Sequence, residues 1–242
     1  MRPTTILFDM DGTLLPMDPD RFTAYYFRLL GELLREHGYD PRPIESAIWR
    51  GTAAMVRNDG SRPNEEAFWP AFFAAAGYPG RERELRQLLM LFYTDEFDSA
   101  SVSCGYTPRA AETVAFCRAC GWDLVVATNP IFPAEAMRIR LRWAGVDPDD
   151  FVRITSYENS TFSKPSPAYY REILRALGRT PEECVMIGND VTEDMVAQTL
   201  GMRVFLLTDD LLNRDGLPLD PYPHGGYDEL QAFLRALAAE EP

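Results

Sequence analysis

The sequence predicts an α/β fold in which a parallel sheet carries helices on both faces and a separate helical segment is inserted near its start. In the second half of the chain, short apolar runs alternate with helical patterns of about 10–15 residues, which is typical of parallel strands joined by helices. Between residues 18 and 101 only helical patterns are found. The 242 residues, 46% of them hydrophobic, suffice for one large domain with a sizeable insertion.

The first strand and the inserted segment differ in pattern. Thr4–Asp9 is an apolar run rich in β-formers that ends abruptly in acids, as expected for a buried strand with Asp9 at its C-terminal edge. Four helices bounded by Gly and Pro should follow. Their ranges are Pro19–His37, Pro41–Asn58, Asn64–Ala76 and Arg81–Phe97. We therefore predict an all-helical domain over residues 18–101 and a core domain of residues 1–17 and 102–242.

After Gly105 helices and strands alternate. The predicted strands are Asp123–Ala127, Phe151–Thr155, Cys184–Ile187 and Arg203–Leu207. The predicted helices are Pro108–Cys120, Pro133–Ala144, Pro167–Leu177, Val191–Leu200 and Tyr227–Ala239. This order is that of a Rossmann-like parallel sheet, in which ligands bind beyond the C-terminal ends of the strands. The Pro-, Gly- and Asp-rich segment Asn213–Gly226 is expected to be an exposed loop.

The charge of the chain excludes some partners. The chain has 24 Lys and Arg residues and 37 Asp and Glu residues, which gives a net charge of −13. We expect no binding to nucleic acid or an anionic membrane, because phosphates select clustered cations. Asp9 comes too early for a signal peptide or membrane helix, and the four cysteines are sparse. We therefore expect a cytoplasmic protein with reduced thiols, and we predict no oligomeric state.

Polar side chains gather where the predicted strands end. Asp9 and Asp11 follow the first strand, and Thr128 and Asn129 follow the second. The run Gly188–Asp190 follows the fourth. Acids gathered in one crevice would repel each other, and Mg²⁺, which prefers hard oxygen ligands, would relieve that repulsion. The alternative is that Asp9 and Asp11 merely cap a turn.

Lys164 is the only lysine of the chain. A bias towards arginine explains the many arginines but not this exception. Lysine differs from arginine where a compact charge on a flexible stem is needed. We therefore expect Lys164 to have a specific role.

Four segments carry a resemblance to a known family. They are FDMDGTLL at Phe8–Leu15, VVATN at Val125–Asn129, KPSP at Lys164–Pro167 and IGNDVTED at Ile187–Asp194. In this order and spacing, the chain resembles the haloacid dehalogenase superfamily, a group dominated by phosphatases, from residue 4 to about residue 208. The resemblance implies that residues 18–101 form a helical cap between the first and second motifs. The acid at Asp11, which the dehalogenases of the superfamily lack, favours phosphoryl transfer.

The resemblance also implies a role for each matching residue. Asp9 would be the nucleophile that forms an aspartyl-phosphate, and Asp11 would protonate the leaving group and then deprotonate water. Mg²⁺ would be held by Asp9, by the main-chain carbonyl of Asp11 and by Asp190. The phosphate group would be bound by Thr128, the main-chain amide of Asn129 and Lys164.

The fourth motif departs from the family pattern of Gly-Asp followed by a second acid. Aligned on Gly188, the metal position falls on Asn189; aligned on the four-residue interval to Asp194, it falls on Asp190. We favour Asp190, because Mg²⁺ needs a carboxylate for charge neutralisation. Asp194 would hold a metal-bound water or Lys164, or would only place favourable charge in the first turn of a helix.

The expected function is Mg²⁺-dependent hydrolysis of a small phosphorylated metabolite. A phosphomutase, or a non-catalytic protein that binds phosphate or metal, is the alternative. Cys117 and Cys120 lack the second pair of a zinc site and are expected to be core thiols. Three further groups are expected in the cap or the site wall: an aromatic seam (Phe68, Trp69, Phe72, Phe73), specificity candidates (Arg50, Arg57, Asn58), and the segment Tyr157–Asn159.

Overall fold

The computed structural model describes residues 3–240 and contains, within them, a six-stranded sheet of order β3-β2-β1-β4-β5-β6. Every neighbouring pair is parallel. β1 therefore lies at the centre, with Phe8 opposite Val126 of β2 and Ile187 of β4. The strands are β1 (Thr5–Phe8), β2 (Asp123–Val126), β3 (Arg153–Ile154), β4 (Cys184–Gly188), β5 (Arg203–Leu207) and β6 (His224–Gly225).

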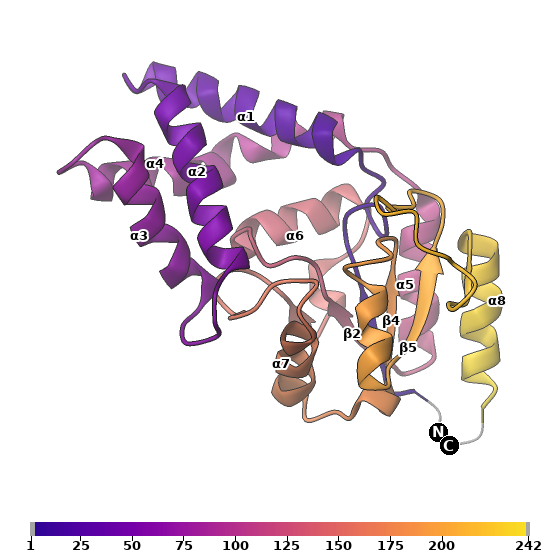
Figure 1. The fold of residues 1–242 in the computed structure, drawn as a ribbon. Coiled ribbons are helices and arrows are strands. Elements are labelled where there is room, and N and C mark those ends of the chain that lie inside the picture. Colours follow the sequence, from indigo (N-terminus) through magenta and orange to yellow (C-terminus); the bar gives the residue numbers. More distant parts are fainter. Residues whose placement is uncertain (1–2, 241–242) are drawn as a thin grey trace.

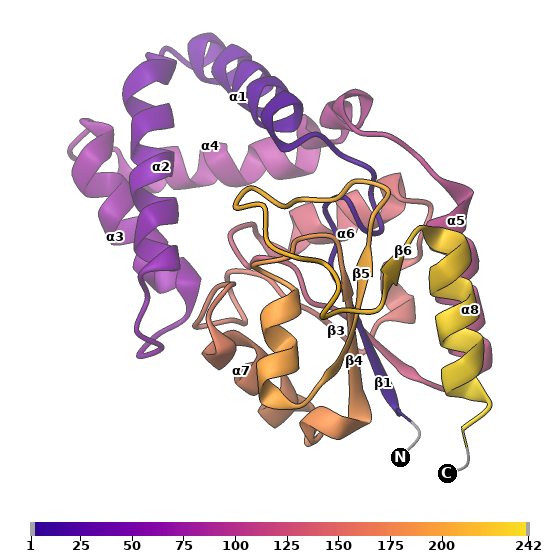
Figure 2. The same ribbon diagram turned by 45° about the vertical axis from the view of Figure 1, so that its right-hand side comes forward.

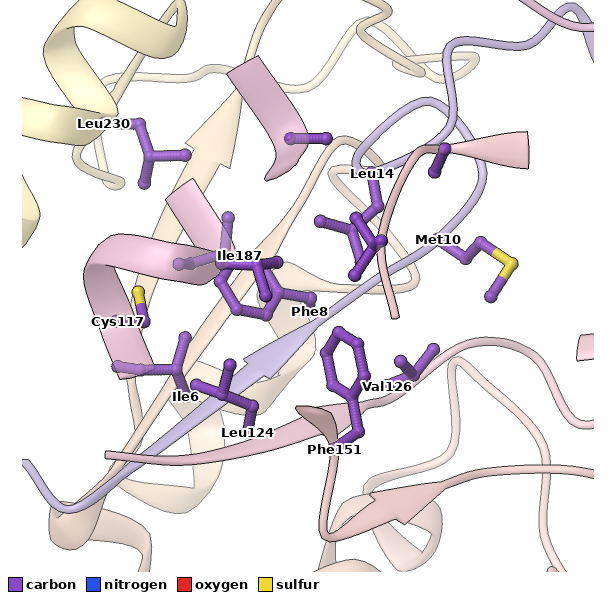
Figure 3. Packing of buried hydrophobic residues seen from close by; sticks show 14 of the residues in the cluster. Ile6, Phe8, Met10, Leu14, Cys117, Leu124, Val126, Phe151, Ile187 and Leu230 are labelled. Carbon is purple, nitrogen blue, oxygen red and sulfur yellow. The ribbon is translucent and has the colours of Figure 1, made fainter. Parts of the chain in front are cut away.

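Helices cover both faces of the sheet (Figure 1). Ile6 and Phe8 of β1 point to one face and Leu7 to the other, as the alternation of a strand requires. Figure 3 shows Ile6 and Phe8 packed among residues that include Cys117 and Leu230. The first face carries α5 (Pro108–Ala119), α6 (Ala134–Trp143) and α8 (Tyr227–Ala238); the second carries α7 (Pro167–Leu177) and the 3₁₀ helix η4 (Met195–Leu200). The predicted Rossmann-like α/β core is confirmed.

Four further helices form a layer set apart from the sheet (Figure 2). They are α1 (Pro19–Glu36), α2 (Pro41–Val56), α3 (Asn64–Ala76) and α4 (Glu82–Asp95), followed by the 3₁₀ helix η1 (Phe97–Ser103). Their shared hydrophobic cluster also takes in Ala136 and Ile139 of α6, so α6 packs against both the sheet and this layer. The predicted all-helical cap is confirmed, and its limits at residues 18 and 101 stay a prediction.

Two predicted elements differ from the structure. Val191–Leu200 is a series of turns followed by η4, and at its start Asp190 Oδ1 accepts hydrogen bonds from the main-chain N–H groups of Thr192 and Glu193, both at 2.8 Å. The segment Asn213–Gly226 is not loop throughout, since its end forms β6 and pairs with β5. Along residues 3–240, no helix is both long and apolar enough to cross a membrane.

Candidate active site

The topology brings three predicted polar segments to one edge of the sheet. Asp9 follows β1, the central strand, while Thr128 follows β2 and Asp190 follows β4, its two neighbours. Because the three strands are parallel and in register, their C-terminal ends lie side by side. Residues more than a hundred positions apart in the chain therefore meet at this edge.

Lys164 lies between two carboxylates. The residue is 2% exposed, and Nζ donates to Asp9 Oδ1 at 2.7 Å and to Asp194 Oδ1 at 2.6 Å. Burial desolvates the ammonium, but the charges of Asp194 and Asp9 more than offset this and raise the pKa of Lys164 well above its usual value. The lone lysine of the sequence is thus the countercharge of a buried acid pair.

Asp9 is held in an environment unusual for a carboxylate. Desolvation by burial raises the pKa of Asp9 to about 7, and Lys164 limits the rise while Asp194 and Asp11 add to it. Perturbed acids of this kind cluster at functional sites, because chemistry uses groups whose protonation is finely balanced. Asp9 is therefore a buried carboxylate whose charge depends on one cation and is opposed by two acids.

Asp194 joins the fourth motif to Lys164. In addition to its bond with Nζ, its Oδ2 accepts the main-chain N–H of Asp190 at 2.9 Å. Gly188 is required here, because a Cβ at this position would collide with the Asp194 carboxylate. Of the expected roles of Asp194, contact with Lys164 is the one that the structure contains; the regular helix assumed for the charge-only alternative does not form there.

Asn189 and Asp190 occupy different environments. Asn189 is 1% exposed; its Oδ1 accepts from Thr13 Oγ1 at 3.2 Å and its Nδ2 donates to the Asp210 carbonyl at 2.6 Å. Gly12, at φ +77°, leaves the space into which the Asn189 amide packs. Asn189 therefore ties the first motif to the loop after β5, and Asp190 is the partly exposed carboxylate of the pair.

Hydrogen bonds from other segments hold the second motif in place. The Thr128 carbonyl accepts hydrogen bonds from Thr155 Oγ1 at 2.9 Å and from the Tyr169 hydroxyl at 2.8 Å. Asn129 Nδ2 donates to Glu193, at 3.1 Å to Oε2, while Asn129 Oδ1 is buried with no hydrogen-bond partner among residues 3–240. These contacts fix the second motif against the fourth and leave one polar atom of Asn129 unsatisfied at the site.

Arg140 is a site residue that the sequence did not predict. It is 1% exposed, and its guanidinium pairs with Asp11 Oδ1 and lies over the rings of Phe22 and Phe132, at 5.0 and 5.2 Å. Burial disfavours its charge, but the charge and hydrogen bond of Asp11 prevail and raise its pKa. The one signal in the sequence is its place on the buried stripe of α6, three residues after Met137.

The donor atoms at this edge suit a hard cation. Among residues 3–240, no three His, Cys, Asp or Glu side chains are gathered into a metal-binding group. Mg²⁺ does not require such a group, because it keeps several waters and uses only one or two carboxylates. Asp9 and Asp190, at the ends of adjacent strands, supply that number, and the oxygen donors exclude a thiolate- or imidazole-based site.

The cap residues proposed for specificity lie elsewhere. Arg50 and Arg57 are exposed, and Asn58 Nδ2 is bonded to the Arg62 carbonyl at 2.8 Å and to Asn64 at 2.9 Å. Of the aromatic seam, Phe68 and Trp69 both belong to the cap cluster and line a cavity next to Asp11. The cap side chains that line this cavity are aromatic, aliphatic or hydroxyl-bearing, and none of those described is cationic.

A family model described as a haloacid dehalogenase-like hydrolase matches residues 3–198. The chain belongs to this family. The resemblance predicted from the four motifs is confirmed, and so is the enzyme class, a hydrolase. The match covers both the cap helices and the four motif segments, so the haloacid dehalogenase-like assignment applies to the whole site.

Similar proteins extend over the full chain. A phosphoglycolate phosphatase of Cereibacter sphaeroides is 29% identical over 242 residues, which cover 97% of this chain and 99% of the relative. A 2-haloacid dehalogenase from Pseudomonas syringae pv. Tomato DC3000 has a TM-score of 0.61 at 22% identity, covering 97% and 99% of the two chains. A predicted phosphoglycolate phosphatase from Haemophilus somnus 129PT has a TM-score of 0.59 at 16% identity, with the same coverage. The solved structures share the fold of this haloacid dehalogenase-like hydrolase.

Proposed function

We propose that the chain is a Mg²⁺-dependent phosphomonoester hydrolase that acts on a small phosphorylated metabolite through a phosphoaspartate at Asp9. The observation that carries the proposal is the buried Asp9–Lys164–Asp194 array at the carboxyl end of the central strand, with Asp11 two residues after Asp9. The phosphatase names of relatives that match over the whole chain also support it. Residues 18–101 would form the cap over this site.

The first displacement uses two carboxylates with different tasks. A carboxylate oxygen of Asp9 attacks phosphorus, the bond from phosphorus to the leaving-group oxygen breaks, and Asp11, which must carry a proton when the substrate is bound, donates that proton to the leaving-group oxygen. In the second displacement, Asp11 takes a proton from water, whose oxygen attacks phosphorus and releases inorganic phosphate and Asp9. Lys164 keeps Asp9 ionised and oriented, because its ammonium bonds to one carboxylate oxygen and leaves the other.

The remaining residues would hold the phosphoryl group and the cation. Thr128, the main-chain amide of Asn129 and Lys164 would bind the phosphoryl oxygens. Asp9, the Asp11 main-chain carbonyl and Asp190 would hold Mg²⁺, which supplies positive charge where a carboxylate must approach a phosphate. Asn189 is left out of the proposed ligand set, because both ends of its amide are bonded inside the protein.

A hydrolysis assay tests the proposal. Release of inorganic phosphate from a generic phosphate monoester should require Mg²⁺, stop on addition of EDTA and fall by several orders of magnitude in Asp9→Asn. Asp95→Asn, at an exposed position near the end of α4, is the matched control and should keep full activity. Turnover that resists EDTA, or an active Asp9→Asn protein, would reject the proposal. Transfer of the phosphoryl group to a second hydroxyl without phosphate release would favour a mutase instead.

A further inference from the structure

A cavity of about 220 Å³ lies next to Asp11, between the cap helices and the loop after β2. All four cap helices contribute to its wall, through residues such as Phe22, Tyr26, Trp69 and Tyr93, and Phe132 closes it from the core side. Figure 1 shows these elements together, with α1, α2 and α4 on one side of α6. The cavity thus lies at the interface of cap and core.

The wall holds a single charged side chain within residues 3–240, and that side chain is the acid Asp11. No Lys, Arg or His of the described chain lines the cavity. Arg140 does not line the wall: its guanidinium pairs with Asp11 and lies over the rings of Phe22 and Phe132, and its Nε is buried without a hydrogen-bond partner among residues 3–240. A carboxylate or second phosphate in this cavity would be buried against a wall that offers no cation among the described residues, which is strongly unfavourable.

The polar groups of the wall are mostly satisfied among themselves. The hydroxyls of Tyr26 and Tyr93 are hydrogen-bonded to each other at 2.8 Å, and the Tyr157 hydroxyl contacts Met90 Sδ at 3.6 Å. Their rings therefore contribute most of the wall, while Nε1 of the lining residue Trp69 is buried without a hydrogen-bond partner among residues 3–240. Such a wall stabilises an apolar body because binding removes the surface of that body from water. It also stabilises a bound aromatic ring through edge and face contacts with the rings of the wall.

The position of the cavity relates it to one part of the substrate. In the proposed function, on which this inference rests, Asp11 protonates the oxygen of the leaving group. Asp11 lines the cavity and Asp9 does not, so the cavity lies on the leaving-group side of the reacting phosphorus. Whatever occupies it is the body of the alcohol that is released, and not the phosphoryl group.

We propose that the leaving group of the substrate is an uncharged, mainly apolar body of the size of one aromatic ring with a short substituent. The size follows from the volume, because a cavity of about 150 Å³ is known to accept benzene, and this one is about 220 Å³. The two-carbon carboxylate of a phosphoglycolate would fill little of this space and would meet no cationic side chain of the described residues in its wall.

The test compares phosphate monoesters that differ only in the body of the alcohol. Benzyl phosphate, 4-carboxybenzyl phosphate and 2-phosphoglycolate all release a primary alcohol, so intrinsic reactivity differs little among them. We expect kcat/KM for benzyl phosphate to exceed that for each carboxylated ester by about 100-fold or more, as expected from burial of a ring against burial of an unpaired charge. A 2-phosphoglycolate value equal to or above the benzyl phosphate value would overturn the inference.

A variant that adds a cation to the wall sharpens the test. Thr52→Arg places a guanidinium in the cavity wall and should lower kcat/KM for benzyl phosphate while raising it for 4-carboxybenzyl phosphate. Thr94→Arg, at an exposed position of α4 outside the wall, is the matched control and should keep the wild-type ratio. An unchanged ratio in a folded Thr52→Arg protein would count against the cavity as the binding place.

The outcomes separate this inference from the proposed function. If none of the three esters is hydrolysed, or if hydrolysis survives in Asp9→Asn, the proposed function fails. If all are hydrolysed in an Asp9-dependent way but the anionic esters are preferred, only the inference about the leaving group fails. The preference among the three esters is measured on the wild-type protein, so this decision does not depend on the folding of Thr52→Arg.

Discussion

Replacing Lys164 by methionine removes the central charge of the site while keeping most of the side-chain volume. In the native protein, Nζ lies 2.7 Å from Asp9 Oδ1 and 2.6 Å from Asp194 Oδ1, and the lysine is buried. Lys164→Met leaves two buried carboxylates without a countercharge. One of them must then take up a proton, and a protonated Asp9 cannot act as the nucleophile.

The magnitude follows from the burial of the array. Removing one partner of a buried ion pair costs about 3–5 kcal/mol, because the remaining charge is uncompensated. At roughly 2–4 °C per kcal/mol for a chain of this size, the midpoint of thermal unfolding should fall by about 6–20 °C. We expect kcat to fall by at least about 100-fold in the same variant.

A double variant separates stability from catalysis. Lys164→Met with Asp194→Asn removes one acid together with the cation, so it should recover part of the lost stability without recovering activity. The surface control is Arg179→Met, which breaks an ion pair with Asp123 whose side chains are 31% and 44% exposed, and which should change stability by only about 0–1 kcal/mol. A Lys164→Met protein with wild-type stability and turnover would refute the reasoning.

Three further predictions concern other parts of the site. Asp190→Asn should weaken Mg²⁺ binding, measured by calorimetry, by about 10–100-fold or more. Asn189→Ala should leave Mg²⁺ affinity within a few-fold of the wild-type value but lower the free energy of unfolding by about 1–3 kcal/mol. The reverse pattern would make Asn189 the ligand. Arg140→Met should lower kcat by about 10–100-fold, because Asp11 would be misplaced. Arg140→Lys should recover part of the lost kcat, and an equal kcat in the two variants would argue against a positioning role for Arg140. Burial raises the pKa of the Cys117 thiol, so the unreactive thiol form persists at pH 8 and iodoacetamide should label it only after unfolding, as mass spectrometry would show.

Local pattern was enough to predict the framework of the site. The apolar run before Asp9 and the helical repeats between the later strands specify a parallel sheet, and in such a sheet the strand ends must meet. Lys164 could be singled out because it is the only lysine of an arginine-rich chain, and lysine differs from arginine where a compact charge on a flexible stem is needed. Its place between Asp9 and Asp194 agrees with that reasoning.

Tertiary packing determined the side-chain contacts that the sequence pattern did not predict. The partners of Asn189 are Thr13 and the Asp210 carbonyl, so its difference from Asp190 depends on how loops distant in sequence pack. Arg140 and Asp11 are separated by 129 residues, and nothing local to either predicts their ion pair. Helical periodicity predicts which face of a helix is buried, but it does not predict which side chains of other elements meet that face. For this reason the strand-end acids follow from the sequence, whereas the aromatic wall beside Asp11 is a property of the folded chain alone.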